Sequence, residues 1–219
     1  MPRPVLLPLV CAALTASCAA SPPITENSTG VRDGRFHTFW LDTGAGEMRL
    51  GRGGSYSVTW RLGENGNLVA GVGWANGSTD RVVRFAARNF DPGTNGYLTL
   101  YGWSRDPLVE YYVVERWGDF VPPGDNATLL GTVDSDGGSY RIYRTRRISQ
   151  PSIEGTATFD QYWSVRTSMR PLGEEAVITF ANHVDAWRRV GLNLGMMDYQ
   201  VLATEGFGSD GRSEVSVWE

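Results

Sequence analysis

The sequence predicts an all-β fold, a sandwich or barrel of many short strands with a single helix beside it. Three observations favour this class. From Phe36 onward the chain divides into short segments rich in Val, Tyr, Trp, Phe and Thr. Gly, Asn, Asp and Pro separate these segments, and no long helical periodicity occurs before about residue 179. Chains punctuated in this way form β-sandwiches and barrels.

The expected strands follow one another along the chain with turn residues between them. They are Ser55–Arg61, Leu68–Trp74, Arg81–Phe90, Gly96–Trp103, Val109–Trp117, Ser139–Arg146, Thr156–Arg166, Tyr199–Glu205 and Ser213–Trp218. Asn65-Gly66, Asn76-Gly77 and Asp91-Pro92-Gly93 are among the turn signals, because these residues adopt the backbone angles that tight turns require.

One segment departs from the strand pattern. Phe180, Val184 and Trp187 recur at i, i+4 and i+7, which places them on one face of a helix. Thr179 suits an N-cap and Gly191 a stop. The sequence therefore predicts one amphipathic helix that packs against the outside of a sheet.

Length, charge and cysteine content exclude several classes of protein. A chain of 219 residues suits one domain with a sizeable core. Twenty basic and 24 acidic residues give a net charge of −4, and no long basic run is present, which argues against nucleic-acid binding. Because Cys11 and Cys18 are the only cysteines, a disulfide framework or cysteine metal site in the body of the chain is excluded.

Residues 1–20 have the pattern of an export signal. Arg3 precedes the apolar run Val5–Ala16, which is too short to span a bilayer. Cleavage near Ala20 would release a soluble protein. The residues that lead to Cys18 also resemble a bacterial lipoprotein box, which would leave a lipid on that cysteine. Both routes stay open.

The expected organisation has three parts. Residues 1–20 form the signal peptide, and residues 21–32 are rich in Pro, Ser, Thr and Asn, which is typical of a flexible lead-in. A single domain is expected over residues 33–219.

Two of the expected strands each carry a carboxylate and a tyrosine on one face. Because side chains alternate along a strand, Glu110 points to the same side as Tyr112, and Tyr199 to the same side as Glu205. If both faces line one concave sheet, two carboxylates would flank a bound sugar ring. Glycoside hydrolysis needs such a pair, one to attack and one to protonate the leaving oxygen. The residues alone leave open the alternative of solvated surface carboxylates.

Four longer stretches carry a resemblance to a known family. Pro107–Glu115 (PLVEYYVVE) closely resembles the nucleophile strand of glycoside hydrolase family 11, the endo-1,4-β-xylanases. Tyr143–Ile153 resembles the thumb hairpin of that family, and Gly155–Arg166 the strand that follows it. Met197–Gln200 with Glu205-Gly206 resembles its acid/base strand. The resemblance runs from about Phe36 to Trp218.

The resemblance implies a fold and a reaction. The fold is a β-jelly roll of two curled antiparallel sheets with one helix, a long substrate cleft and a thumb hairpin. The reaction is retaining hydrolysis of internal β-1,4 bonds of xylan by double displacement, without a metal or organic cofactor. Glu110 matches the nucleophile and Glu205 the acid/base, with the two carboxylates expected about 5–5.5 Å apart. Residues 33–219 would then be the catalytic domain.

The resemblance also implies a set of sugar contacts. They are Trp40, Tyr101, Tyr112, Arg147, Pro151, Ser152, Gln161 and Tyr199, with Asn95 and Tyr97 at other glycone-side positions. Thr59 matches the position where the family places Asn or Asp beside the acid/base. Since a threonine cannot ionise, the family's relation between that residue and the pH optimum does not transfer.

Several residues near these positions are expected to be structural. Glu115 faces the opposite side from Glu110, His183 lies inside the helix, and Trp103 and Trp117 suit the core.

The expected partner is xylan, and no nucleic acid is expected. A secreted, extracellular monomer follows, with no membrane contact unless Cys18 is lipidated. Two alternatives remain, a non-catalytic carbohydrate-binding jelly roll and a jelly-roll β-1,4-glucanase.

Overall fold

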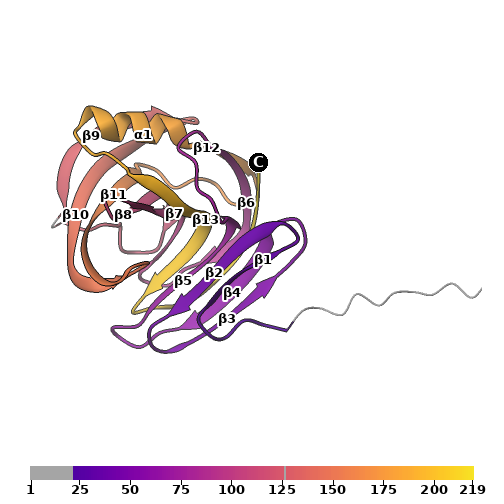
Figure 1. Ribbon diagram of the computed structural model, residues 1–219. Helices are drawn as coiled ribbons and strands as arrows, with labels where there is room; N and C mark the ends of the chain where they lie inside the picture. The colour runs from indigo at the N-terminus through magenta and orange to yellow at the C-terminus, as the bar shows by residue number, and fades with distance from the viewer. Residues whose placement is uncertain (1–21, 126) are drawn as a thin grey trace, which may run out of the picture.

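The computed structural model describes residues 22–125 and 127–219, so the predicted signal peptide and Cys18 lie outside the described residues. The described residues form two curled sheets and one helix (Figure 1). All nine expected strands are present. The predicted all-β jelly roll with a single helix is therefore confirmed.

The larger sheet forms the concave side of the molecule. Its order is β1 (Ser28–Arg32), β2 (Arg35–Leu41), β5 (Asn67–Trp74), β13 (Met196–Phe207), β7 (Gly96–Arg105), β8 (Val109–Trp117), β11 (Gly155–Arg166), β10 (Gly138–Ser152) and β9 (Thr128–Ser135). The smaller sheet has the order β12 (Glu175–Thr179), β6 (Val82–Asp91), β14 (Asp210–Trp218), β4 (Ser55–Arg61) and β3 (Ala45–Leu50). Among the described strands, β8 and β11 pair in parallel and all other pairs are antiparallel.

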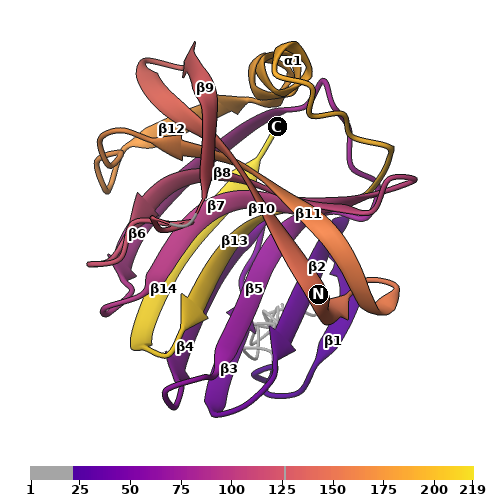
Figure 2. The same ribbon diagram turned by 90° about the vertical axis from the view of Figure 1, so that its left-hand side faces the viewer.

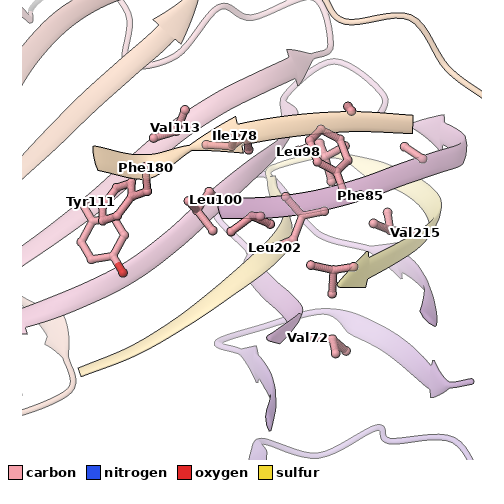
Figure 3. Packing of buried hydrophobic residues seen from close by; sticks show 14 of the residues in the cluster. Val72, Phe85, Leu98, Leu100, Tyr111, Val113, Ile178, Phe180, Leu202 and Val215 are labelled. Atoms are coloured by element: carbon pink, nitrogen blue, oxygen red, sulfur yellow. The ribbon is translucent and has the colours of Figure 1, made fainter. Parts of the chain in front are cut away.

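The main hydrophobic core lies between the two sheets. Figure 3 shows Leu100 and Leu202 of the larger sheet packed with Phe85 and Val215 of the smaller one. A second apolar cluster lies on the concave face of the larger sheet and includes Tyr97, Tyr112 and Trp163. The central strands β7, β8 and β13 are thus buried on both faces. Burial on both faces fixes these three strands, which makes them a rigid support for side chains on the concave face.

The helix α1 (Phe180–Arg189) contacts β9 and β6, on the side of the molecule away from β1 and β3 (Figure 1). Phe180, Val184 and Trp187 are buried, as the spacing predicts. Thr179 occupies the N-cap position, but its hydroxyl donates to Asp136 (2.8 Å) instead of capping the helix. The helix ends before Gly191, whose φ of 81° is the left-handed conformation that glycine adopts easily.

The structure corrects the predicted flexible lead-in. The last part of the segment 21–32 is strand β1, which pairs with β2 from Ser28 opposite Phe39 to Arg32 opposite Arg35. The two residues between these strands, Asp33 and Gly34, have φ of 50° and 73°. Positive φ at both central positions is the geometry of a tight β-hairpin turn, and Asp-Gly is a preferred sequence for it. The segment was misjudged because its polar composition hides an edge strand that is held mainly by main-chain hydrogen bonds.

The predicted thumb is the hairpin of β10 and β11, a long curled arm in Figure 2. The two strands pair from Tyr140 opposite Arg166 to Ser152 opposite Gly155. The register shifts between Arg147 and Gln150, where the hairpin bends. This shift lies beside the residues that the hairpin contributes to the concave face.

Candidate active site

The concave face of the larger sheet carries a cleft of about 780 Å³. Strands β2, β5, β13, β7, β8 and β11 contribute residues to it, and the outer half of the β10–β11 hairpin contributes more. Its aromatic lining consists of Trp40, Tyr97, Tyr101, Trp103, Tyr112, Phe120, Phe159, Trp163, Tyr199 and Phe207. Aromatic side chains with polar tips suit a ligand that has both apolar faces and hydroxyl groups.

Two buried carboxylates lie in this cleft. Glu110 comes from β8 and is 8% exposed, while Glu205 comes from β13 and is 5% exposed. Strand β7 lies between them in the sheet. The predicted alternation is confirmed, because Glu110 and Tyr112 line the cleft while Tyr111 packs in the core between the sheets.

Both oxygens of Glu110 accept hydrogen bonds. The hydroxyl of Tyr101 donates to Oε1 (2.7 Å), and the side-chain amide of Gln161 donates to Oε2 (2.7 Å). The pKa of Glu110 is raised overall by burial, although the hydrogen bonds from Tyr101 and Gln161 and the positive charge of Arg147 lower it in part. The donors therefore favour the ionised carboxylate, which is the form that can act as a nucleophile.

Glu205 has fewer hydrogen-bond partners than Glu110, and its own pKa is strongly raised. The hydroxyl of Tyr97 donates to Oε1 (2.8 Å), and Oε2 is buried with no hydrogen-bond partner among the described residues. Burial, and next the negative charge of Glu110, raise the pKa of Glu205 to about 8. Tyr97, Arg147 and the Asn67 side chain oppose this rise. The donors to Glu110 thus stabilise its anion, and the charge of that anion in turn favours a protonated Glu205, the separation of roles that acid/base chemistry needs.

Aromatic contacts hold the walls of the site in place. The ring of Tyr112 stacks on Trp163 with centroids 3.8 Å apart and an angle of 5°. Tyr101 packs against Tyr112 at 5.2 Å and against Tyr199 at 6.1 Å. Because several rings share neighbours, the hydroxyl groups that contact the carboxylates have little freedom to move.

A comparison with protein families assigns the chain. The model of the family described as glycosyl hydrolases family 11 matches residues 32–216. The chain belongs to this family. The match includes both carboxylates and the whole thumb hairpin.

Three relatives illustrate the similarity of this family 11 hydrolase to curated proteins. A probable endo-1,4-beta-xylanase B of Aspergillus clavatus is 46% identical over 195 residues, which cover 89% of this chain and 85% of the relative. An ethylene-inducing xylanase of Hypocrea rufa is 46% identical over 190 residues, or 86% and 82%. Endo-1,4-beta-xylanase Xyn11B of Cellvibrio japonicus is 45% identical over 209 residues. That alignment covers 94% of this chain, which spans 58% of the length of Xyn11B.

The predicted sugar contacts of this family 11 hydrolase gather in one place. Trp40, Asn95, Tyr97, Tyr101, Tyr112, Arg147, Pro151, Ser152, Gln161 and Tyr199 all line the cleft with Glu110 and Glu205. Their roles toward a sugar stay predictions. For Tyr97 the structure adds a direct bond to Glu205 that the sequence did not suggest.

Thr59 is the exception, and the prediction for it is wrong. It lies on β4 of the smaller sheet, where Val58 and Trp60 are buried and Thr59 is exposed. The residue beside Glu205 is Asn67, at the start of β5, which lines the cleft. Asn67 lies opposite Phe207, and Val69 lies opposite Glu205. Only this pairing of β5 with β13 places Asn67 near the carboxylate, so the single sequence carried no signal for it.

Several further cleft residues were missed, among them two tryptophans and a threonine. Trp103, expected in the core, lines the cleft, and its indole N–H donates to the hydroxyl of Tyr101 (2.8 Å). Trp163 and Thr145 also line it. Alternation along β7 could have found Trp103, because it lies two residues after Tyr101 and so shares its face.

The described residues were also compared with the requirements of a metal site and of a membrane-spanning helix. In residues 22–125 and 127–219, no group of three or more His, Cys, Asp or Glu side chains is placed to hold a metal ion. In the same residues, no helix is long and apolar enough to cross a membrane.

Proposed function

We propose that this chain is a retaining endo-1,4-β-xylanase, with Glu110 as nucleophile and Glu205 as acid/base. The observation that supports this most is the pair of buried carboxylates in one cleft. Two side chains donate hydrogen bonds to Glu110, and the pKa of Glu205 is raised to about 8. Three relatives that are 45–46% identical to this chain are named as xylanases, which supports the choice of substrate.

The first displacement forms a covalent glycosyl-enzyme. An oxygen of Glu110 attacks the anomeric carbon, and the bond from that carbon to the leaving oxygen breaks as Glu205 donates its proton to it. The new ester removes the negative charge of Glu110. Because that charge is one cause of the raised pKa of Glu205, the pKa of Glu205 falls as the ester forms.

The second displacement returns the enzyme to its starting state. Glu205, now ionised, takes a proton from water while the water oxygen attacks the anomeric carbon and displaces Glu110. Two inversions at that carbon retain its configuration. The proton that Glu205 gave away is thereby replaced, and no further reactant is required.

The walls of the cleft suit a neutral polysaccharide. Trp40 and Tyr199 provide aromatic surfaces at the β2 and β13 side, and Pro151 and Ser152 of the thumb hairpin lie on the cleft as well. Xylan has an uncharged backbone, so stacking and hydroxyl hydrogen bonds would dominate its binding. A cleft in which both carboxylates lie among such surfaces fits cleavage within a chain.

Incubation with xylan tests this function. Reducing sugar should rise with the wild-type protein and stay at background with Glu110→Ala. Glu205→Ala should lose activity on xylan but regain part of it on an activated aryl xyloside with azide, because that leaving group needs no proton. An unchanged rate for Glu110→Ala would exclude it as nucleophile.

The same assays separate the alternatives. Faster hydrolysis of carboxymethyl-cellulose than of xylan would indicate a β-1,4-glucanase. Retention on insoluble xylan with no release of reducing sugar at any pH would indicate a carbohydrate-binding protein.

Export as a monomer is part of the proposal. Residues 1–20 would direct secretion, with cleavage near Ala20 or lipidation at Cys18. The mass of the mature protein from the native host distinguishes the two routes, since a diacylglyceryl group adds several hundred daltons to the chain.

A further inference from the structure

A chain of three hydrogen bonds ends on the nucleophile. The indole Nε1 of Trp163 donates to Oγ1 of Thr145 (2.9 Å), and the hydroxyl of Thr145 donates to Oε1 of Gln161 (2.8 Å). The amide Nε2 of Gln161 then donates to Oε2 of Glu110 (2.7 Å). The four side chains come from the thumb hairpin and from β8, which pairs with β11 in parallel.

The chemistry of its two ends fixes the direction of this chain. An indole N–H can only donate a hydrogen bond, and an ionised carboxylate can only accept one. Because Trp163 donates to Thr145, the hydroxyl proton of Thr145 is free to point toward Gln161. That proton selects the carbonyl oxygen of Gln161 and leaves the NH₂ group for Glu110. The reverse amide orientation would set a carbonyl oxygen against the carboxylate.

The other oxygen of Glu110 has a similar arrangement. The indole of Trp103 donates to the hydroxyl of Tyr101 (2.8 Å), which donates to Oε1 of Glu110 (2.7 Å). A tyrosine hydroxyl has one proton, so the donation from Trp103 leaves that proton for Glu110. Each oxygen of Glu110 thus accepts a hydrogen bond from a side chain, and a tryptophan determines the orientation of that side chain.

We propose that Thr145 is a positioning residue for Glu110, which it controls through Gln161, and that the indole N–H of Trp163 sets its orientation. The inference rests on the proposed role of Glu110 as nucleophile. Gln161 contacts the carboxylate directly, whereas Thr145 acts one residue further away. Its hydroxyl keeps the amide of Gln161 turned so that it stabilises the ionised nucleophile.

The expected effect on ionisation follows from the groups around Glu110. The titratable and charged groups that influence or face it are Tyr97 and Tyr101 of β7, Tyr112 of β8, Arg147 of the thumb hairpin, and Tyr199 and Glu205 of β13. None of these changes when the hydroxyl of Thr145 is removed. The hydrogen bond from Gln161 lowers the pKa of Glu110, so its loss raises that pKa.

Thr145→Val tests the proposal because valine keeps the shape of threonine without its hydroxyl. We expect the acidic limb of the kcat/KM profile to move up by about one pH unit, the order of effect of one hydrogen bond to a charged group. We expect kcat on xylan to fall about tenfold with KM changed little. Thr145→Ser, which keeps the hydroxyl, should restore both. Thr132→Val, an exposed position on the neighbouring strand β9, is the control for loss of a threonine hydroxyl.

A second measurement is independent of turnover. The δ-carboxyl ¹³C resonance of Glu110 gives its pKa directly by NMR titration, and the side-chain NH₂ resonances of Gln161 report its hydrogen bonding. In Thr145→Val we expect the first to titrate at higher pH and the second to shift.

Two results would overturn the proposal. One is an unchanged pH profile and an unchanged Glu110 titration in Thr145→Val. The other is an equal loss in Thr145→Ser, which would show that packing of the side chain matters and its hydroxyl does not. Full activity of Glu110→Ala would instead refute the proposed function, while the NMR titration would still decide whether Thr145 controls the Glu110 carboxylate.

Discussion

Strand β8 carries two buried glutamates that face opposite sides of the larger sheet. Glu110 faces the cleft and accepts hydrogen bonds from neutral donors. Glu115 is completely buried on the other face, where it accepts a hydrogen bond from Tyr140 (2.6 Å) and forms ion pairs with Arg166 and Arg170. The alternation along β8 predicts a structural role for Glu115, and its contacts have that character.

The difference lies in the partners and not in the residue type. Two guanidinium groups neutralise Glu115 at Oε2, and the hydroxyl of Tyr140 donates to Oε1, so its charge serves to join β8, β11 and the segment that leads to β12. Neutral donors hold Glu110 in place. In the described part of the chain it forms no ion pair, and the charge of Arg147 acts on it without direct contact. A carboxylate of the second kind costs more to bury, yet its charge stays available for a substrate. The following predictions test whether Glu110 acts in catalysis and Glu115 in stability.

The largest expected effect is on activity at Glu110. Glu110→Gln should lower kcat on xylan at least about a thousandfold, because an amide oxygen cannot form the ester intermediate. Its midpoint of thermal unfolding should equal or exceed that of the wild type, since a buried charge is removed. Parallel rate and melting measurements check both. A variant with more than a tenth of the wild-type rate would contradict the assignment.

At Glu115 the expected effect is on stability. Glu115→Gln should lower the free energy of unfolding by about 3–5 kcal/mol, because it leaves the buried Arg166 and the partly buried Arg170 without their carboxylate. Urea denaturation measures this change, and kcat of the folded variant at low temperature should stay within a few-fold of wild type. The exposed pair of Glu175 and Arg84 (3.0 Å) provides the control, since Glu175→Gln should cost about 1 kcal/mol or less. Equal losses at positions 115 and 175 would remove the distinction.

Glu205 extends the comparison to pH. Its pKa is about 8 in the folded protein, against an ordinary value of 4.5. Between these values the folded state binds more protons than the unfolded state, so this group makes the wild type less stable as the pH rises from about 4.5 to 8. Glu205→Gln removes the dependence. We expect its free energy of unfolding relative to wild type to increase across this window, by on the order of 3 kcal/mol. Denaturation at pH 4.5 and pH 8 measures it, and a difference that does not change with pH would contradict the raised pKa.

The parts of this molecule that were predictable from sequence depend on local periodicity. The two-residue repeat of β8 placed Glu110 and Tyr112 on one face, and the spacing of Phe180, Val184 and Trp187 placed the helix. Both follow from the geometry of a single element. The resemblance of whole segments to a family then predicted the two carboxylates and ten other residues of the cleft.

The errors concern contacts between distant segments. Which residue lies beside Glu205 depends on the pairing of β5 with β13, and neither strand alone determines that pairing. Thr59 and Asn67 lie eight positions apart in neighbouring segments, and both are polar residues of a predicted turn-and-strand pattern. Burial of Val58 and Trp60 in the core is what turns Thr59 outward. Strand β1 was missed for a similar reason, because its pairing with β2 holds it in the sheet and its polar composition does not indicate a strand.

The smallest predicted effect distinguishes Asn67 from Thr59. The side chain of Asn67 lowers the pKa of Glu205, so Asn67→Ala should raise that pKa and move the basic limb of the kcat/KM profile up by about half a pH unit. Thr59→Val should leave the profile in place, because Thr59 is exposed on the smaller sheet. Profiles of both variants between pH 4 and 10 measure the difference. A shift in Thr59→Val without one in Asn67→Ala would restore the residue that the sequence first suggested, and would mean that the cleft at Glu205 is built differently in solution.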